Sequence, residues 1–248
     1  MQFMEIVKGI EIIDLSIYLR KYNTLIISDT HIGYEESLNK SGIFIPRFQF
    51  KEIIQRLEGI FKQLKATTKN QLDKIIINGD IKHEFGTISE QEWRHTLQLL
   101  DFLSKHCKEI ILIKGNHDKI IGPIAEKRNI KVVDQFTFDT ILITHGHIVP
   151  NLRSYKTIII GHEHPAISIH DTIRTETYKC YLKGTYKKKT LIVQPAFNLV
   201  TEGTDVSKEK LLSPFLKQSL KNFNVYVVAE DKVLDFGKIR GLIPRHIP

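Results

Sequence analysis

The chain has 248 residues, of which 42% are hydrophobic and 26% are charged, and its formal net charge is +8. This composition is ordinary for a globular protein, and the length suffices for one large domain over residues 1–248 with a full hydrophobic core. No apolar stretch approaches the roughly 18 residues of a membrane-spanning helix, so no membrane association is expected.

Export signals and disulfides are not expected either. The apolar start, residues 1–13, is interrupted by charged side chains and lacks the basic region and apolar core of a signal peptide. Only two cysteines are present, Cys107 and Cys180, which excludes a disulfide scaffold. We therefore expect a cytoplasmic protein with two buried free thiols.

In the first half of the chain, short apolar runs alternate with amphipathic helical stretches. The second predicted helix opens with a capping box, Ser89 and Glu92. This alternation predicts parallel strands joined by crossover helices. The expected elements, in chain order, are a strand at 24–28, a helix at 48–66, a strand at 74–78, a helix at 89–106 and a strand at 109–114.

The second half of the chain reads as strands with short connections, interrupted by one helix at 207–220. A strand-rich half after an α/β half predicts two stacked sheets with helices outside. We also expect the first strands, within residues 4–15, to be added at a sheet edge. The predicted strands of this half are 140–144, 156–160, 166–170, 178–182, 190–194, 224–229 and 232–236.

The positive charge is uneven along the chain. A net charge of +8 favours a polyanionic partner or substrate. Residues 178–189 contain five lysines and no acidic residue, which fits either a solvated hairpin tip or a contact with a phosphate backbone. These lysines are Lys179, Lys183, Lys187, Lys188 and Lys189.

Five short polar clusters each follow the carboxyl end of an apolar run, where ligands bind in open α/β sheets. Any one of them fits capping or core polar residues, but five in series indicate one metal site. They are Asp29-Thr30-His31, Gly79-Asp80, Gly115-Asn116-His117-Asp118, Thr144-His145-Gly146-His147 and Gly161-His162-Glu163-His164.

Carboxylate, imidazole and amide oxygen together form a ligand set of intermediate hardness. Such a set suits Mn, Fe, Zn or Ni better than Ca or Mg. A lone carboxylate such as Asp80 can bridge two cations. No serine or cysteine lies in a recognisable nucleophile motif, and none is needed where a water shared by two metal ions becomes a hydroxide near neutral pH.

The cluster series resembles the calcineurin-like metallophosphoesterase superfamily over residues 29–164. The stretches SDTHIGYEESL, GIFIPRFQF, GDIKHEFG, GNHD, GHEHPAI and PAFNLVTEGTDV are similar to archaeal SbcD/ICC-related phosphoesterases and, more distantly, to bacterial DNA-ligase-associated metallophosphoesterases. The resemblance implies an α/β fold, a four-layer α-β-β-α sandwich of two stacked mixed sheets. It also allows a homodimer.

The resemblance further implies two divalent ions, with Mn²⁺ preferred and Fe, Zn or Ni as alternatives, and a metal-bridging hydroxide as the nucleophile. The first ion would be held by Asp29, His31, Asp80 and His164, and the second by Asp80, Asn116, His145 and His162. His117 would assist the leaving oxygen and Asp118 would orient His117. Family practice favours His145 over His147 as the ligand, which would leave His147 behind it or facing the phosphate.

Four further residues are candidates for contacts with the ligands or the substrate: His83, Lys82, Arg47 and Tyr34. An ordinary loop, surface or packing role fits each of them at least as well. The function expected from the whole pattern is a phosphodiesterase or nuclease acting on nucleic acid or nucleotides. A phosphomonoesterase or small-nucleotide hydrolase is the alternative, and a non-catalytic scaffold is a third reading that the complete ligand series disfavours.

Overall fold

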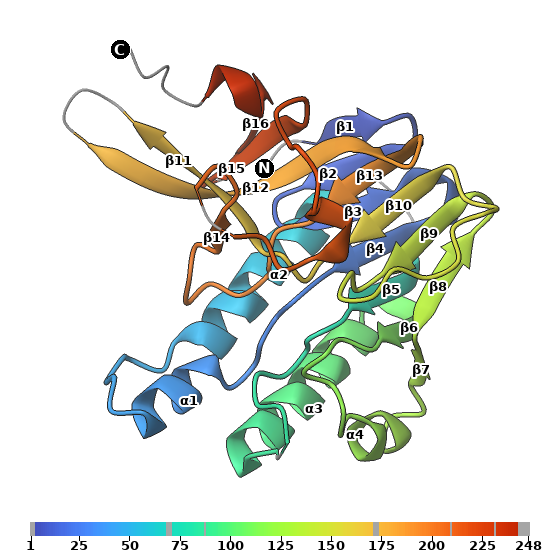
Figure 1. The fold of residues 1–248 in the computed structure, drawn as a ribbon. Helices are drawn as coiled ribbons and strands as arrows, with labels where there is room; N and C mark the ends of the chain where they lie inside the picture. The colour runs from blue at the N-terminus through green and yellow to red at the C-terminus, as the bar shows by residue number, and fades with distance from the viewer. Residues whose placement is uncertain are drawn as a thin grey trace.

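Two mixed β-sheets stack face to face, and helices cover the outer face of the first (Figure 1). The computed structural model describes residues 3–67, 71–86, 88–170, 174–208, 210–230 and 232–242. The predicted α/β fold with two stacked mixed sheets is confirmed. Among the described residues, no helix combines the length and the apolar character that spanning a bilayer requires.

The first sheet has seven strands that lie side by side in chain order. Strands β4 to β7 run parallel, as predicted from the crossover pattern, and β1 to β3 add an antiparallel edge. The strands are β1 (Met4–Val7), β2 (Ile10–Ile13), β3 (Ser16–Leu19), β4 (Thr24–Ile27), β5 (Leu72–Asn78), β6 (Cys107–Ile113) and β7 (Lys131–Val133).

The second sheet has nine strands. Its centre is parallel, β9 beside β10 beside β13, and the remaining pairs are antiparallel except β11 with β14. The strands are β8 (Gln135–Phe138), β9 (Ile141–Thr144), β10 (Thr157–Ile160), β11 (Pro165–His170), β12 (Thr175–Tyr186), β13 (Lys189–Val193), β14 (Thr204–Asp205), β15 (Asn224–Ala229) and β16 (Lys232–Lys238).

Two long helices, α2 (Gln49–Thr67) and α3 (Glu90–Ser104), pack on the first sheet. Helix α2 buries Ile53, Leu57, Ile60 and Leu64, one face at helical spacing. Helix α3 begins with the predicted capping box, in which Ser89 and Glu92 bond each other's backbone N–H. The shorter helical elements are α1 (Tyr34–Lys40), α4 (Gly122–Glu126), η1 (Arg20–Tyr22), η2 (Pro214–Leu216) and η3 (Ile239–Gly241).

The predicted helix at 207–220 is wrong. In the described part of this segment the chain forms only the 3₁₀ turn η2. The Glu163 carboxylate accepts the backbone N–H groups of Leu212 (2.9 Å) and Ser213 (2.8 Å), and Pro214 has no N–H to offer. The apolar side chains of the segment still cover the outer face of the second sheet, so this layer is formed without an α-helix.

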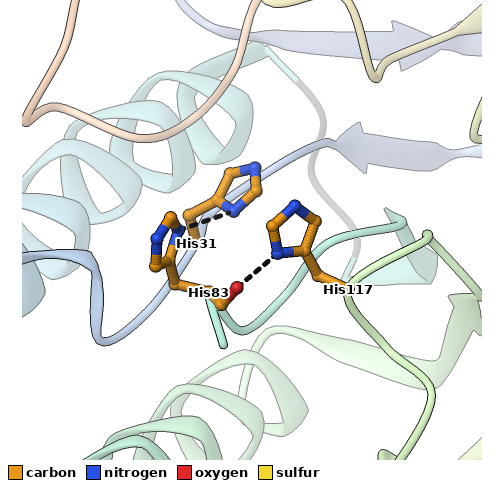
Figure 2. A group of neighbouring side chains, drawn as sticks. All are labelled: His31, His83 and His117. Atoms are coloured by element: carbon orange, nitrogen blue, oxygen red, sulfur yellow. Dashed lines mark hydrogen bonds between the residues drawn. The ribbon is translucent and has the colours of Figure 1, made fainter. Parts of the chain in front are cut away.

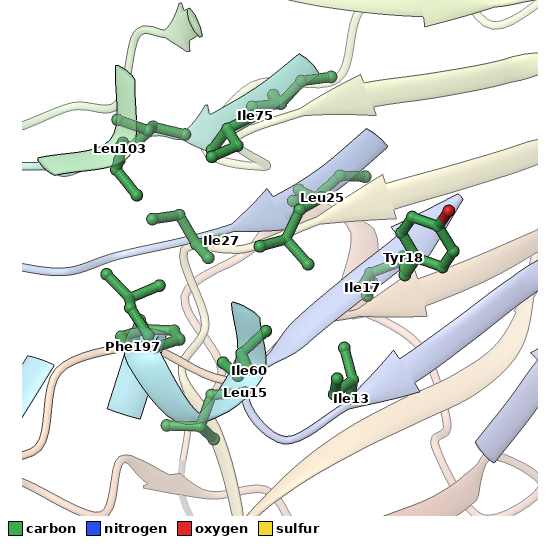
Figure 3. Close-up of a cluster of buried hydrophobic side chains, with 14 of the residues drawn as sticks. Ile13, Leu15, Ile17, Tyr18, Leu25, Ile27, Ile60, Ile75, Leu103 and Phe197 are labelled. Carbon is green, nitrogen blue, oxygen red and sulfur yellow. The ribbon is translucent and has the colours of Figure 1, made fainter. Parts of the chain in front are cut away.

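The second sheet packs against two separate hydrophobic cores, one on each of its faces, and alternating residues of its parallel strands point into one or the other. In β10, Ile159 faces the first sheet, whereas Ile158 and Ile160 face the segment around η2. Figure 3 shows the main core, where Ile60 of α2 and Leu25 of β4 lie among residues of the first sheet. Burial of each such isoleucine or leucine side chain contributes roughly 1.5–3 kcal/mol to the stability of the fold. Because the strands bury these side chains on both faces, hydrophobic packing stabilises both faces of the second sheet.

Two buried polar contacts tie the sheets together. Gln194, directly after β13, donates from Nε2 to the carbonyls of Leu15 and Ile26, both at 3.0 Å. The hydroxyl of Tyr181 in β12 donates to the carbonyl of Asp14 at 3.0 Å. Because these groups are shielded from water, loss of either contact would leave a buried polar group without a partner, at a cost of about 1–3 kcal/mol.

The lysine-rich segment is mostly structural. Lys179, Lys183 and Lys189 donate their ammonium groups to backbone carbonyls, and only Lys187 and Lys188 stand exposed at the β12–β13 turn. Because β13 runs parallel to β10, this turn lies at the opposite end of the sheet from the histidines that follow β10. The solvated hairpin tip is therefore the better description of these lysines.

Replacing Tyr181 by Phe is expected to lower the free energy of unfolding by about 1–2 kcal/mol, because the Asp14 carbonyl loses its partner inside the protein. Urea denaturation measures the change. The control is Tyr186→Phe on the same strand, where the hydroxyl makes no hydrogen bond within the described part of the chain. Equal stability of the Tyr181→Phe protein and the wild type would show that this bond does not hold the sheets together.

Candidate metal centre

The five polar clusters converge between the two sheets. Asp29 and Asp80 follow β4 and β5 of the first sheet, and His145 and His164 follow β9 and β10 of the second. Across the seam, Asp29 Oδ1 lies 3.3 Å from His164 Nε2, and Asp80 Oδ2 lies 3.3 Å from His145 Nε2. The carboxyl ends of both parallel sets therefore meet in one place.

One ligand group is formed by Asp29, His31 and His164, whose ligand atoms all lie within 4.8 Å of one another. The Nε2 atoms of His31 and His164 are 3.2 Å apart. Burial and the neighbouring His164 imidazole hold the pKa of His31 well below its ordinary value. This ring is therefore neutral at pH 7, the form in which imidazole binds a metal ion.

A second group is formed by Asp80, His145 and His162, and Asn116 lies beside it. The Asn116 side-chain oxygen lies 3.1 Å from His145 Nε2. On its other side, His145 Nδ1 lies 3.1 Å from the Asn78 carbonyl, a partner that fixes the ring and leaves Nε2 facing the group. Both groups have the mixed carboxylate and imidazole chemistry that divalent transition metals favour.

The electrostatics of the centre fit a cation. Burial opposes ionisation of both carboxyls, but the His164 and His145 imidazoles outweigh it for Asp29, and His145 does so for Asp80, so both pKa values are lowered. Asp29 Oδ1 is buried and has no hydrogen-bond partner among the residues described. Two buried carboxylates that face imidazoles form a site that further positive charge would stabilise.

The carboxylates act strongly on His145. Burial opposes its protonation, yet Asp29 and Asp80 outweigh this and raise the pKa of His145 to about 9. In contrast, burial lowers the pKa of His162 to about 4 and also lowers that of His147. His147 lies outside both ligand groups, and its Nδ1 is buried without a hydrogen-bond partner in the described structure.

The backbone is strained at these side chains. Asp29, His31, Asp80, His162 and His164 all have left-handed φ angles, between 44° and 67°. Each such residue costs about 1–2 kcal/mol relative to an ordinary conformation. Strain of this kind persists where surrounding structure imposes it, and it gathers at functional sites.

Two glycines permit the close approach of the strand ends. A Cβ at Gly115 would lie 2.0 Å from Asp80 Oδ1, and one at Gly161 would lie 2.4 Å from Asp29 Oδ2. No side chain fits at those distances, so both positions require glycine if the carboxylates are to keep their places.

His117 lies beside the carboxylates with a fixed ring. Its Nδ1 is bonded to the backbone carbonyl of His83, which leaves Nε2 3.9 Å from Asp80 Oδ2. Figure 2 shows the rings of His31, His83 and His117 gathered around a common space. Ligand atoms of these three residues also lie within 4.8 Å of one another.

The position of Asp118 differs from the expected one. Its carboxylate accepts the backbone N–H groups of Ile81 (3.2 Å) and Gly115 (2.9 Å), so it joins the loops after β5 and β6. Burial, followed by the charge of Asp80, raises the pKa of Asp118 to about 6. The ring of His117 is instead oriented by the His83 carbonyl, a backbone group that no sequence motif reveals.

Two candidate substrate contacts are occupied by other partners. Arg47 pairs with Glu36 at 2.6 Å, and Lys82 is fully buried with its ammonium on the Glu84 carbonyl. His83 does lie at the centre, with Nδ1 3.4 Å from His31 Nδ1. Tyr34 reaches the centre through His83, on which its ring stacks at 4.2 Å.

Several supporting residues carried no signal in the sequence. Ser28 donates to Asp29 Oδ2 at 2.5 Å, and Gln49 Nε2 donates to the carbonyls of Thr30 (3.2 Å) and His31 (3.0 Å). Phe85 lies against His117, with ring centroids 3.6 Å apart and planes inclined by 31°. The contacts of Gln49 and Phe85 join segments far apart in the chain, and only Ser28, which is adjacent to Asp29, could be suspected from its position.

Two solved structures match this chain at low sequence identity. A nuclease MPE from Pseudomonas putida is similar in fold, with a TM-score of 0.65 and 19% identity, covering 95% of this chain and 99% of that one. A Streptococcus pneumoniae predicted phosphoesterase matches with a TM-score of 0.33 and 14% identity, over 87% and 97% of the two chains. None of the curated proteins compared matches the chain.

The model of the family described as calcineurin-like phosphoesterase matches residues 22–200. This stretch runs from the start of β4 to beyond β13 and includes every member of the two ligand groups. The chain therefore belongs to the calcineurin-like phosphoesterase family and is a phosphoester-hydrolysing enzyme.

Proposed function

We propose that this protein is a binuclear metal-dependent phosphodiesterase that acts on nucleic acid or nucleotides. The observation that carries the proposal is the pairing of two ligand groups in one buried seam, with His145 Nδ1 only 3.6 Å from Asp29 Oδ1. The first ion is assigned to Asp29, His31, Asp80 and His164, and the second to Asp80, Asn116, His145 and His162.

Divalent ions bound there, with Mn²⁺ as our first choice, would supply a hydroxide nucleophile near neutral pH and positive charge for the phosphoryl oxygens. The side chains of the protein orient the reacting groups and transfer a proton. The His83 carbonyl holds His117 Nδ1, so Nε2 is free to give a proton to the leaving oxygen as the P–O bond breaks. Deep burial of both carboxylates keeps competing water away from their charges.

A cavity beside the second group supports a diester substrate. It has a volume of about 630 Å³, and its lining includes Asn116, His147, Lys114 and Lys119 together with the acidic residues Asp118 and Asp134. Both lysines are exposed. A phosphodiester that continues past the scissile bond would find room and positive charge here, whereas a phosphomonoester would leave the cavity unused.

Replacing His117 by Ala is expected to lower kcat by about 10²–10⁴-fold on a diester with a poor leaving group, because proton donation is lost. Metal content should stay at the wild-type level, since His117 has no ligand role in the proposal. Assays of bis(4-nitrophenyl) phosphate, 4-nitrophenyl phosphate and single-stranded DNA with Mn, Ni, Zn and Mg test the activity itself. A clear preference for the monoester would favour the phosphomonoesterase reading, and no turnover with any metal would overturn the proposal.

Metal binding is expected to release about one proton at pH 7. Because Asp29 and Asp80 raise the pKa of His145 to about 9, its ring is protonated at pH 7 in the metal-free protein. A ligating imidazole must be neutral, so the affinity for Mn²⁺ should rise about tenfold per pH unit as pH approaches 9. Calorimetry in buffers of different ionisation enthalpy counts the protons released.

The matched control for this experiment is His147→Ala. Its lowered pKa leaves His147 neutral at pH 7, so this variant should release the same number of protons as the wild type. The His145→Gln variant should bind the second ion without that release or fail to bind it. Unchanged proton release in His145→Gln would show that His145 is not the ligand.

The cavity lysines are tested by the double variant Lys114→Ala, Lys119→Ala. If each lysine meets one phosphate, the slope of log KM against log salt for a single-stranded oligonucleotide should weaken by about 1.4. Turnover of bis(4-nitrophenyl) phosphate should not change. The control is Lys187→Ala, Lys188→Ala, which removes the same charge at the far end of the second sheet; equal effects from both pairs would refute the cavity as the binding path.

A further inference from the structure

We propose that Phe85 is a positioning residue that holds the His117 ring in its proton-donating orientation. This inference rests on the proposed role of His117. It assigns a function to an aromatic side chain that is 52% exposed and therefore is not kept in place by core burial alone.

The contact between the two rings is close. Their centroids lie 3.6 Å apart and their planes are inclined by 31°. His117 meets the edge of His31 at 4.9 Å and 90°, and its Nδ1 is held by the His83 carbonyl. With one nitrogen tied and one flank against His31, the phenyl ring of Phe85 supplies a third restraint on the imidazole.

The loop that carries Phe85 is itself anchored. Glu92 Oε1 accepts the backbone N–H groups of His83 (3.2 Å) and Glu84 (2.9 Å), while its other oxygen caps helix α3. Tyr34 stacks on His83 from the side of α1, and Lys40 of α1 pairs with Glu84 at 3.0 Å. Phe85 therefore stands on a fixed base, as a residue that orients another must.

The physical effect of Phe85 follows from these restraints. Without the phenyl ring, the imidazole keeps one hydrogen bond but gains freedom to tilt about it, so its Nε2 points at the leaving oxygen for less of the time. A small misplacement of this kind lowers the rate of proton transfer. It leaves substrate affinity unchanged, because Phe85 acts through His117.

This role predicts a dependence on the leaving group. When an alkoxide leaves, the proton on His117 Nε2 passes to the oxygen as its bond to phosphorus breaks. When 4-nitrophenolate leaves, the anion is stable and no proton is needed. A residue that acts only by orienting His117 must therefore matter for the first reaction and not for the second.

The experiment compares Phe85→Ala, Phe85→Tyr, His117→Ala and the double variant Phe85→Ala, His117→Ala. Each is assayed with Mn²⁺ on thymidylyl-thymidine, which has an alkoxide leaving group, and on bis(4-nitrophenyl) phosphate. We expect Phe85→Ala to lower kcat on the dinucleotide by about tenfold, a part of the loss from removing His117, with KM unchanged. On the nitrophenyl ester its kcat should stay within about twofold of wild type, and Phe85→Tyr should restore the dinucleotide rate.

The double variant gives the decisive comparison. If Phe85 acts through His117, the double variant is no slower on the dinucleotide than His117→Ala alone, because the two losses are not additive. Phe44→Ala is the matched control, since Phe44 is 86% exposed and should be removable without effect on either substrate. Metal content and thermal unfolding of each variant check that the centre and the fold are intact.

Three results would overturn the inference. Additive losses in the double variant, or a rise in KM on the dinucleotide, would mean that Phe85 contacts the substrate directly. Equal losses on both substrates in Phe85→Ala would mean a purely structural role. Failure of the proposed function is a separate outcome, in which the wild type hydrolyses neither ester with any of the four metals, and it would remove the basis of the inference as well.

Discussion

The structure depends on two carboxylates buried in a seam between sheets. Asp29 and Asp80 stand at the ends of adjacent parallel strands, almost fully shielded from solvent. Negative charge in such a place is costly unless positive or polarised groups face it. The compensating imidazoles of His145 and His164 come from the opposite sheet. The charges of the two carboxylates are therefore compensated only when the two sheets are stacked.

The need to bring these carboxylates and imidazoles together explains several energetically unfavourable features of the fold. Left-handed backbone at five of the centre's residues turns each side chain sharply into the seam. Gly115 and Gly161 leave space where the strand ends nearly touch. Gln194 and Tyr181 hold the sheets at a fixed separation through buried hydrogen bonds. The well-packed core on both faces of the second sheet offsets these local penalties.

The surroundings of the centre are asymmetric. On one side lies an aromatic wall, in which Tyr34 covers His83 and Phe85 covers His117. Beside the second ligand group lies the cavity with Lys114 and Lys119. One side thus orients the ring proposed to move a proton, and the other offers charge and space to a continuing phosphodiester.

The sequence by itself determined the strand ends and their chemistry. Isoleucine-rich runs such as 74–78 and 109–114 predicted parallel strands, and period and capping predicted α2 and α3, because these signals are local. Asp29, Asp80 and the histidines could be selected because metal-ligand residue types follow those runs. The helix expected at 207–220 failed because Glu163, distant in sequence, took the backbone N–H groups that a helix would use.

Only the tertiary structure decided how the selected residues are held. It placed Asp118 on the backbone of Ile81 and Gly115 instead of on His117, and it gave that ring the His83 carbonyl and the Phe85 side chain. It also set three lysines of the basic segment on backbone carbonyls. Such pairings depend on which loops meet after the sheets stack. A chain pattern records residue type and spacing, but not contacts made across a seam between distant segments.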